Sequence, residues 1–260
     1  MNFKDKNSEN NSKIKMNKSK VENSKNLDLI MEFIEDEYNE LSYEEALKKD
    51  KREYCIYYIS LLKTKHNLIF SFFNGNDYNS RIIKIDLFFI NFIIYYTINA
   101  LFFNDDTMHK IYVSNGSFNI ENRIPQIIYS SLISMILNIP LKLLALSNKE
   151  IIIFKQSKNN NKEKIKERYI SLIKKLKIKF ILYFIFGFIL LFLFWFYLSM
   201  FSAIYRNTQY HLIKDTLICF GLSLIFPFGI YLLPGLFRIP SLYNKNRICL
   251  YNCSKVMQMI

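Results

Sequence analysis

Residues 180–205 read FILYFIFGFILLFLFWFYLSMFSAIY, a run of 26 residues without a charged side chain. In a helix this run is apolar on every face, whereas a helix on the surface of a soluble protein has a polar face. The hydrocarbon core of a bilayer is about 30 Å thick and needs roughly 20 helical residues at about 1.5 Å each. The run therefore predicts a membrane-spanning helix.

Three further uncharged runs cover residues 87–103, 124–141 and 216–237. With flanking residues, the sequence predicts four spans, at about 82–103, 124–146, 178–205 and 212–237. We expect an all-α fold, an integral membrane four-helix bundle in a domain of residues 81–238. A buried helix of a soluble core is the alternative for any single run. The first two runs come closest to that alternative because they contain Asn91, Asn99 and Asn138.

Composition narrows the class of protein further. The 260 residues carry a formal net charge of +13 and are 51% hydrophobic, which excludes a disordered or collagen-like chain. The apolar residues are gathered into long runs, so an ordinary basic nucleic-acid binder is also disfavoured. None of the four cysteines falls in a predicted external loop, so no disulfide framework is expected.

The N-terminal region changes character twice. Residues 1–27 are a Lys- and Asn-rich tail that we expect to be disordered, and they lack the apolar core of a secretory signal, so the first span should direct targeting. Residues 28–45 hold eight acids and no base. This acidic segment is either a docking site for a basic protein partner or a solvated helix.

A basic amphipathic helix follows within residues 28–80. Ser42 and Glu45 form a capping-box pattern, and apolar or aromatic residues recur at three- and four-residue steps from Tyr54 to Phe73, between lysines. We expect this helix to lie along the cytosolic face of the membrane, where tyrosine rings and lysines meet anionic lipid headgroups. Packing against the cytosolic end of the bundle is the alternative.

Loop charges set the expected orientation. The N-terminal flank, the three loops between the spans and the C-terminal tail carry 3, 2, 11, 2 and 4 bases, in this order. Because basic loops stay in the cytosol, both termini, the loop 147–177 and the tail 239–260 are expected there. Asn115-Gly116-Ser117 is a glycosylation acceptor pattern in the first non-cytosolic loop, which agrees with this orientation.

Two groups of residues within the spans are candidate sites. Ser130, Ser134 and Asn138 are four apart and so share one face of the second span. This polar face is either a polar path or a surface on which small residues let helices approach closely. Pro227 and Pro234 in the fourth span either break the helix into a site with free carbonyls or kink it, with Pro234-Gly235 ending it.

Charged residues near the spans have plain explanations as well. Lys84 and Asp86 are expected to anchor the inner edge of the first span by reaching water, with a conduction role for Asp86 as the alternative. Asp105, Asp106 and His109 form either a metal cluster or a hydrogen-bonded turn. The sequence contains no phosphate-binding loop, no G-x-S-x-G and no H-E-x-x-H, so no catalytic, cofactor or metal site is predicted and an enzyme is unsupported.

Several stretches resemble a known type of module. NDYNSRIIKIDLFF (76–89), YYTINALFFNDDTMHKIY (95–112), IPQIIYSSLIS (124–134), TQYHLIKDTLICFGLSL (208–224) and LPGLFRIPSL (233–242) are similar to a multi-pass membrane module of single-celled eukaryotes such as ciliates. The resemblance covers residues 41–255. It implies a eukaryotic endomembrane or plasma-membrane protein, and no activity is attached to the module.

Together these patterns predict a multi-pass membrane protein with a structural, interaction or anchoring role. Its expected partners are the bilayer, with anionic lipid at the cytosolic face, and a protein that binds the acidic segment. A small-solute or ion transporter or channel subunit that uses the second and fourth spans is the alternative.

Overall fold

The computed structural model describes residues 35–75, 77–103, 105–113, 120–156, 162–244 and 247–258. Within these ranges the chain folds into helices and contains no strand. Four helices are long and apolar enough to cross a membrane, over Arg81–Leu101, Ile124–Ala145, Glu163–Ile204 and Arg206–Tyr243. The prediction of an all-helical protein with four membrane-length apolar helices is confirmed, and this composition fits a membrane protein.

The long elements are α6 (Arg81–Leu101), α8 (Ile120–Ala145), α10 (Lys162–Ile204), α11 (Gln209–Ile230) and α12 (Leu232–Tyr243). Shorter helices precede, connect and follow them. These are α2 (Glu35–Glu40), α3 (Tyr43–Lys49), α4 (Tyr54–Lys65), α5 (Asn67–Phe72), α7 (Asp105–Val113), α9 (Asn148–Gln156) and α13 (Ile248–Met257).

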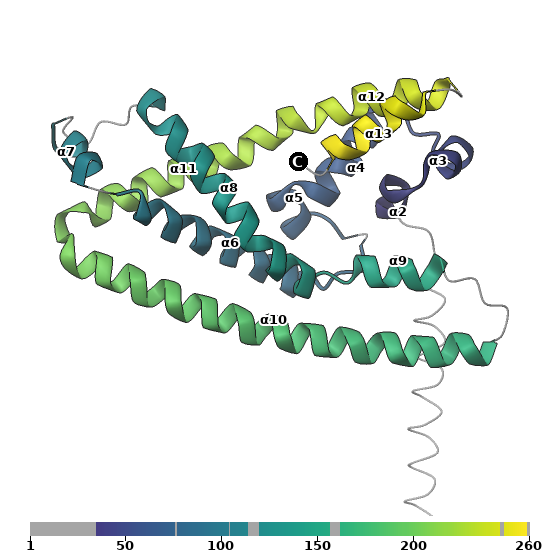
Figure 1. Cartoon of the computed structure of the whole chain (residues 1–260), viewed down its shortest axis with the longest axis horizontal. Helices are drawn as coiled ribbons and strands as arrows, with labels where there is room; N and C mark the ends of the chain where they lie inside the picture. The colour runs from purple at the N-terminus through teal and green to yellow at the C-terminus, as the bar shows by residue number, and fades with distance from the viewer. Residues whose placement is uncertain are drawn as a thin grey trace, which may run out of the picture.

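Helix α6 occupies the centre of the molecule and contacts α5, α8, α10 and α11 (Figure 1). Its buried side chains Ile90, Ile94 and Ile98 belong to a core cluster that also contains Leu141 of α8 and Tyr183 of α10. Half of the apolar stretch of α6 is buried inside the protein, against 11% of that of α10. The first span is therefore mostly covered by protein, and the third is mostly exposed.

Helix α10 runs without interruption for 43 residues along one side of the molecule (Figure 1). At about 1.5 Å per residue it is about 65 Å long, roughly twice the thickness of a hydrocarbon core. Its apolar part begins at Phe180, and residues 162–179 precede it as a basic extension of the same helix. A short 3-10 turn, Arg206–Thr208, then leads directly into α11.

The segment expected to form one amphipathic helix, from the capping box at Ser42 to Phe73, is divided into α3, α4 and α5. Helix α4 ends at His66, whose imidazole Nδ1 accepts a hydrogen bond from the Ile69 amide and so caps the start of α5. A capped start favours a new helix at this point. The capping box expected at the start of the preceding helix is present, with both reciprocal Ser42–Glu45 bonds.

The fourth apolar helix is divided at Tyr231, a residue that lies between Pro227 and Pro234. Helix α11 contains Pro227 and ends at Ile230, and α12 starts at Leu232 and continues to Tyr243. Pro234 thus lies in the first turn of α12, where a missing amide donor is tolerated. The helix starts anew near Pro234-Gly235 and does not end there, which differs from the simple kink considered from sequence.

Candidate functional site

A row of buried and half-buried polar side chains runs between α6, α8 and α11, and we call it the polar seam. Its members are Asn91 and Asn99 of α6, Gln126, Ser130, Ser134 and Asn138 of α8, and Thr216 of α11. Ser130, Ser134 and Asn138 are 0%, 3% and 2% exposed, whereas most of their neighbours on α8, such as Leu132 and Ile136, are exposed. The polar face of the second span therefore points into the protein.

Amide side chains join the three helices at two levels of the seam. The Asn138 amide donates to Asn91 Oδ1, and the Gln126 amide donates to Asn99 Oδ1. Asn99 Nδ2 in turn donates to Thr216 Oγ1 over 2.8 Å. Hydrogen bonds of this kind stabilise helix association in membranes by about 0.6 kcal/mol on average, with a maximum of about 1.7.

Three oxygens of the seam make no hydrogen bond within the described part of the chain. They are Ser130 Oγ, Ser134 Oγ and Asn138 Oδ1. By contrast, Ser131 Oγ donates to the Ile127 carbonyl of its own helix over 2.7 Å. The two seam serines thus make no hydrogen bond to the backbone of their own helix. The seam therefore offers hydrogen-bonding groups that no side chain of the described residues uses.

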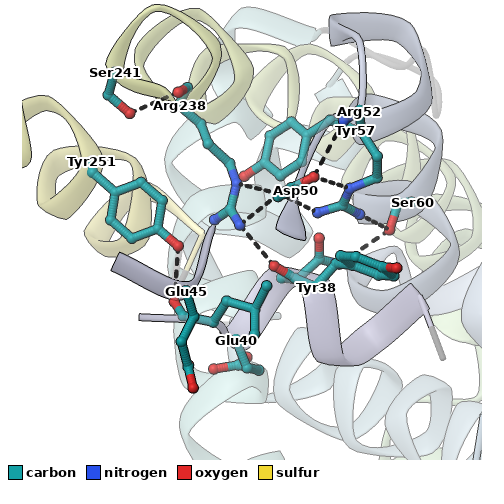
Figure 2. A network of polar contacts seen from close by, with 12 residues as sticks. Tyr38, Glu40, Glu45, Asp50, Arg52, Tyr57, Ser60, Arg238, Ser241 and Tyr251 are labelled. Carbon is teal, nitrogen blue, oxygen red and sulfur yellow. Dashed lines mark hydrogen bonds and ion pairs between the residues drawn. The ribbon is translucent and has the colours of Figure 1, made fainter. Parts of the chain in front are cut away.

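A second cluster of polar side chains, the Asp50 network, lies beyond the apolar runs (Figure 2). Asp50 follows α3 and binds two arginines. Arg52 donates to its two carboxylate oxygens over 2.7 and 2.9 Å, and Arg238 of α12 donates twice to Oδ2 over 2.9 and 3.2 Å. Residues 188 positions apart in the sequence therefore share one carboxylate.

Arg238 is completely buried, with its guanidinium carbon 5.1 Å from the Tyr57 ring centroid and 4.8 Å from that of Tyr251. Its Nη2 also donates to the Tyr38 carbonyl over 2.7 Å. Aromatic faces attract a guanidinium, and the Asp50 carboxylate neutralises part of its charge. The arrangement holds α12 and α13 against the N-terminal helices.

The surroundings of Asp50 act on its pKa in opposite directions. Burial alone would raise the pKa of this carboxyl, but hydrogen bonds and charge from Arg52, and then from Arg238, outweigh burial and place its pKa below the usual range. Burial raises the pKa of the nearby Tyr57 hydroxyl. Asp50 is therefore a carboxylate at neutral pH, and the cluster contains one carboxylate for two guanidinium groups.

Helix α4 is attached to the α11–α12 junction by side-chain donors. Tyr54 and Tyr58 hydroxyls donate to the Leu232 and Phe228 carbonyls over 2.8 and 3.0 Å. His66 Nε2 lies 2.8 Å from the Leu224 carbonyl, and since Nδ1 accepts from Ile69, Nε2 is the protonated nitrogen. Three carbonyls spaced four residues apart thus receive donors from one neighbouring segment.

The remaining candidates lie in different places. Pro227 and Pro234 flank the junction just described, and Asn115 lies outside the described residues. Asp106 and His109 are exposed on α7, and no group of three or more possible metal-binding side chains is found within the ranges that the structure describes. Of these residues, the ones that the structure describes do not join the seam.

Lys84 differs from its expected role at the membrane edge. It is 1% exposed and pairs with Asp77 over 2.9 Å, while also donating to the Asn74 carbonyl over 2.6 Å. Its charge is neutralised inside the protein and does not reach water through the side chain. Asp86, half-buried one turn away from the start of α6, accepts a hydrogen bond from the Tyr183 hydroxyl over 2.8 Å.

Comparison of the chain with models of known protein families, with curated proteins and with solved structures finds no match. The resemblance to a multi-pass module of single-celled eukaryotes therefore stays a prediction.

Proposed function

We propose that this chain is a multi-pass membrane anchor whose cytosolic basic surface binds anionic lipid headgroups. In this proposal the four apolar helices form a membrane bundle with both termini in the cytosol. The observation that carries the proposal is α10, in which a basic segment and an apolar span form one unbroken helix. A helix that emerges from the bilayer in this way must place its last basic turns at the headgroups.

Distance from the apolar part divides the exposed bases of α10 into two groups. The proximal group is Lys174, Lys175 and Lys177, and the distal group is Lys164, Lys166 and Arg168. At about 1.5 Å per residue, the proximal bases lie about 5–9 Å from Phe180 along the helix and the distal bases about 18–24 Å. Electrostatic attraction is screened beyond about 8 Å at physiological salt, so the proximal group is the one that senses a lipid surface.

Helix α4 supports the same proposal, because part of its apolar surface faces outward. It buries Tyr57 and Leu61 within the protein while Ile56 and Ile59 stay exposed. A helix with one apolar edge on the protein and another facing outward fits the headgroup plane, where such an edge enters the lipid. The interfacial placement predicted from sequence and contact with the rest of the chain are therefore compatible.

The acidic segment 28–45 is proposed to dock a basic protein, with part of it already used within the chain. Glu37 pairs with Lys155 of α9 and accepts a hydrogen bond from the Tyr78 hydroxyl over 2.8 Å. Residues 28–34, which carry Asp28 and Glu32, lie outside the described residues. The proposal for this segment rests on its charge alone.

Charge reversal of the two groups tests the lipid proposal. The full-length protein is purified in neutral detergent, and its thermal unfolding is followed with and without added phosphatidylserine. The anionic lipid should raise the midpoint for the wild type and for the distal triple variant K164E/K166E/R168E. For the proximal triple variant K174E/K175E/K177E, the anionic lipid should raise the midpoint much less. High salt should likewise reduce the rise in midpoint for the wild type. Equal stabilisation of all three proteins, or by neutral phosphatidylcholine, would contradict the proposal.

The polar seam favours a second candidate, a small-solute or ion transporter or channel subunit that uses the second and fourth spans. The buried face of α8 carries unused oxygens, and a series of hydrogen bonds links Gln126 of the same helix through Asn99 to Thr216 of α11. Polar groups of this kind inside apolar helices favour a membrane path. Flux through proteoliposomes that Asn138→Leu abolishes would support this candidate.

A further inference from the structure

The seam serines are the starting point, because their hydroxyls behave differently from the others in the same helices. Thr97 and Ser131 donate to the carbonyl four residues earlier, as a hydroxyl in a membrane helix ordinarily does. Ser130 and Ser134 are more deeply buried and yet make no such bond. Something other than their own backbone must therefore satisfy them.

The energetic cost of an unsatisfied polar group indicates which molecule bonds the seam hydroxyls. A buried polar group without a partner costs about 1–3 kcal/mol, and Ser130, Ser134 and Asn138 place three such oxygens on one helix face. Water is the smallest molecule that can remove this cost, and a buried water typically makes two to four hydrogen bonds to groups of this kind. Oxygens four residues apart are spaced about 6 Å along the helix, a distance that a chain of two bridging waters spans.

The charges around the seam determine which kind of solute can move along such a row of water molecules. The members of the seam are neutral, and a carboxylate lies near each of its ends. Asp86 lies five residues before Asn91 on α6, and Asp215, which is 6% exposed, precedes Thr216 on α11. Lys84 is paired with Asp77, and Lys142, one turn beyond Asn138, is exposed. Carboxylates and free oxygens favour a cation over an anion.

We propose that the polar seam is a hydrated path for a small monovalent cation, entered beside Asp215 and left beside Asp86. The proposal rests on the transport candidate above and names its substrate class. From Asp86 to Asn99 the path follows 13 residues of α6, or about 20 Å of a hydrocarbon core about 30 Å thick. Protons and alkali ions share this chemistry, and the experiment separates them.

Hydration is tested first, by the reactivity of introduced cysteines. In a full-length background with the four native cysteines replaced by serine, Ser134→Cys is compared with Leu132→Cys, which is 48% exposed on the outer face of α8. A small charged methanethiosulfonate reagent, which reacts in water and not in lipid, should modify the cysteine at 134 at least tenfold faster. Equal rates, or no reaction at 134, would overturn the hydrated path and the transport candidate with it.

Flux is tested second, in proteoliposomes of the full-length protein. Proton entry is followed with a trapped pH-sensitive dye, and sodium and potassium entry with radioactive tracers, under an imposed membrane potential. The double variant S130A/S134A should lose at least tenfold of the flux, whereas S131A should retain it, since that hydroxyl is bonded to Ile127. Asp215→Asn should also reduce the flux, and it removes charge without changing shape.

The outcomes distinguish the two levels of the proposal. Flux of protons alone, or of alkali ions alone, supports the path and identifies the cation. A reactive cysteine at 134 together with passage of an uncharged solute such as glycerol, but of no cation, overturns the substrate class and leaves transport standing. No flux of any probe in protein that unfolds at the wild-type temperature overturns both.

Discussion

The polar seam and the Asp50 network are two buried polar clusters of opposite design. The seam is built from neutral amides and hydroxyls within apolar helices, and several of its oxygens are unused. The Asp50 network is built from full charges, and its carboxylate receives four hydrogen bonds from two arginines. A full charge is costly in hydrocarbon, whereas a neutral group costs less and can serve helix contact. Position relative to the apolar runs thus determines which chemistry each cluster uses.

Removing the carboxylate of the network should have the largest effect on stability. Asp50→Ala leaves the buried guanidinium of Arg238 and the half-buried one of Arg52 without a counter-charge. Loss of one partner of a buried ion pair costs about 3–5 kcal/mol. Thermal or SDS-induced unfolding of the purified protein measures the change. Glu44→Ala, an exposed acid on the same helix, serves as control and should be near neutral. A loss below about 1 kcal/mol would show that the network contributes little.

Packing at the α4–α12 contact should rank next. A methyl group added to Gly235 would lie 2.6 Å from Cε2 of Tyr54, whose ring is held by the hydroxyl bond to Leu232. Gly235→Ala should therefore destabilise the protein by about 1–3 kcal/mol. Gly229→Ala meets nothing within 4 Å and should be neutral or stabilise by about 0.5–1 kcal/mol. The same unfolding assay compares them, and similar midpoints for both variants would argue against close contact here.

The seam should respond more weakly than the network to loss of one hydrogen-bonding residue. Asn99→Leu removes the bond to Thr216 and the acceptor for Gln126, at a cost of about 0.6–1.7 kcal/mol. Asn207→Leu changes an exposed residue of the short turn before α11 and serves as the control, which should be near neutral. A loss as large as that of Asp50→Ala would mean that the seam is a structural centre of the fold.

Acid should remove part of the stability of the Asp50 network, and this is the smallest effect. The pKa of Asp50 is lowered in the folded protein, so its stabilising contribution is complete above the unfolded value of about 3.9 and is lost as pH falls through the lower folded value. The difference in unfolding midpoint between wild type and Asp50→Asn should be constant from pH 5 to 7 and narrow below about pH 4. A difference that stays constant to pH 3 would contradict this assignment.

The spans could be predicted from the sequence, because lipid imposes both a length and an absence of charge that are visible residue by residue. The polar face of α8 could also be predicted from the sequence, since Ser130, Ser134 and Asn138 repeat at the helical period. The break between α4 and α5 at His66 could not be predicted, because it depends on an imidazole that accepts a hydrogen bond from the Ile69 amide and lies beside the Leu224 carbonyl of a distant helix. Periodicity carries no information of that kind.

The long-range ion pairs were beyond sequence reasoning for a related reason. Asp50 and Arg238 belong to segments that, taken separately, are an ordinary helix end and the flank of a span. Lys84 looked like a residue that reaches water, yet it pairs with Asp77 in a loop before its own helix. Which charge meets which is decided by tertiary packing, so a pattern along the chain predicts that charges exist but not how they pair.

Two long-range contacts have a consequence for biosynthesis. They are the ion pair between Asp50 and Arg238 and the hydrogen bond from the Tyr251 hydroxyl to the Leu41 carbonyl. The segment around Asp50 is translated before α12 and α13, and it finds these contacts only once both helices have been made. Until then Asp50 has Arg52 alone, and the faces of α3 and α4 that later meet α12 and α13 stay uncovered. The N-terminal helices can therefore close on α12 and α13 only after the fourth apolar helix has been translated.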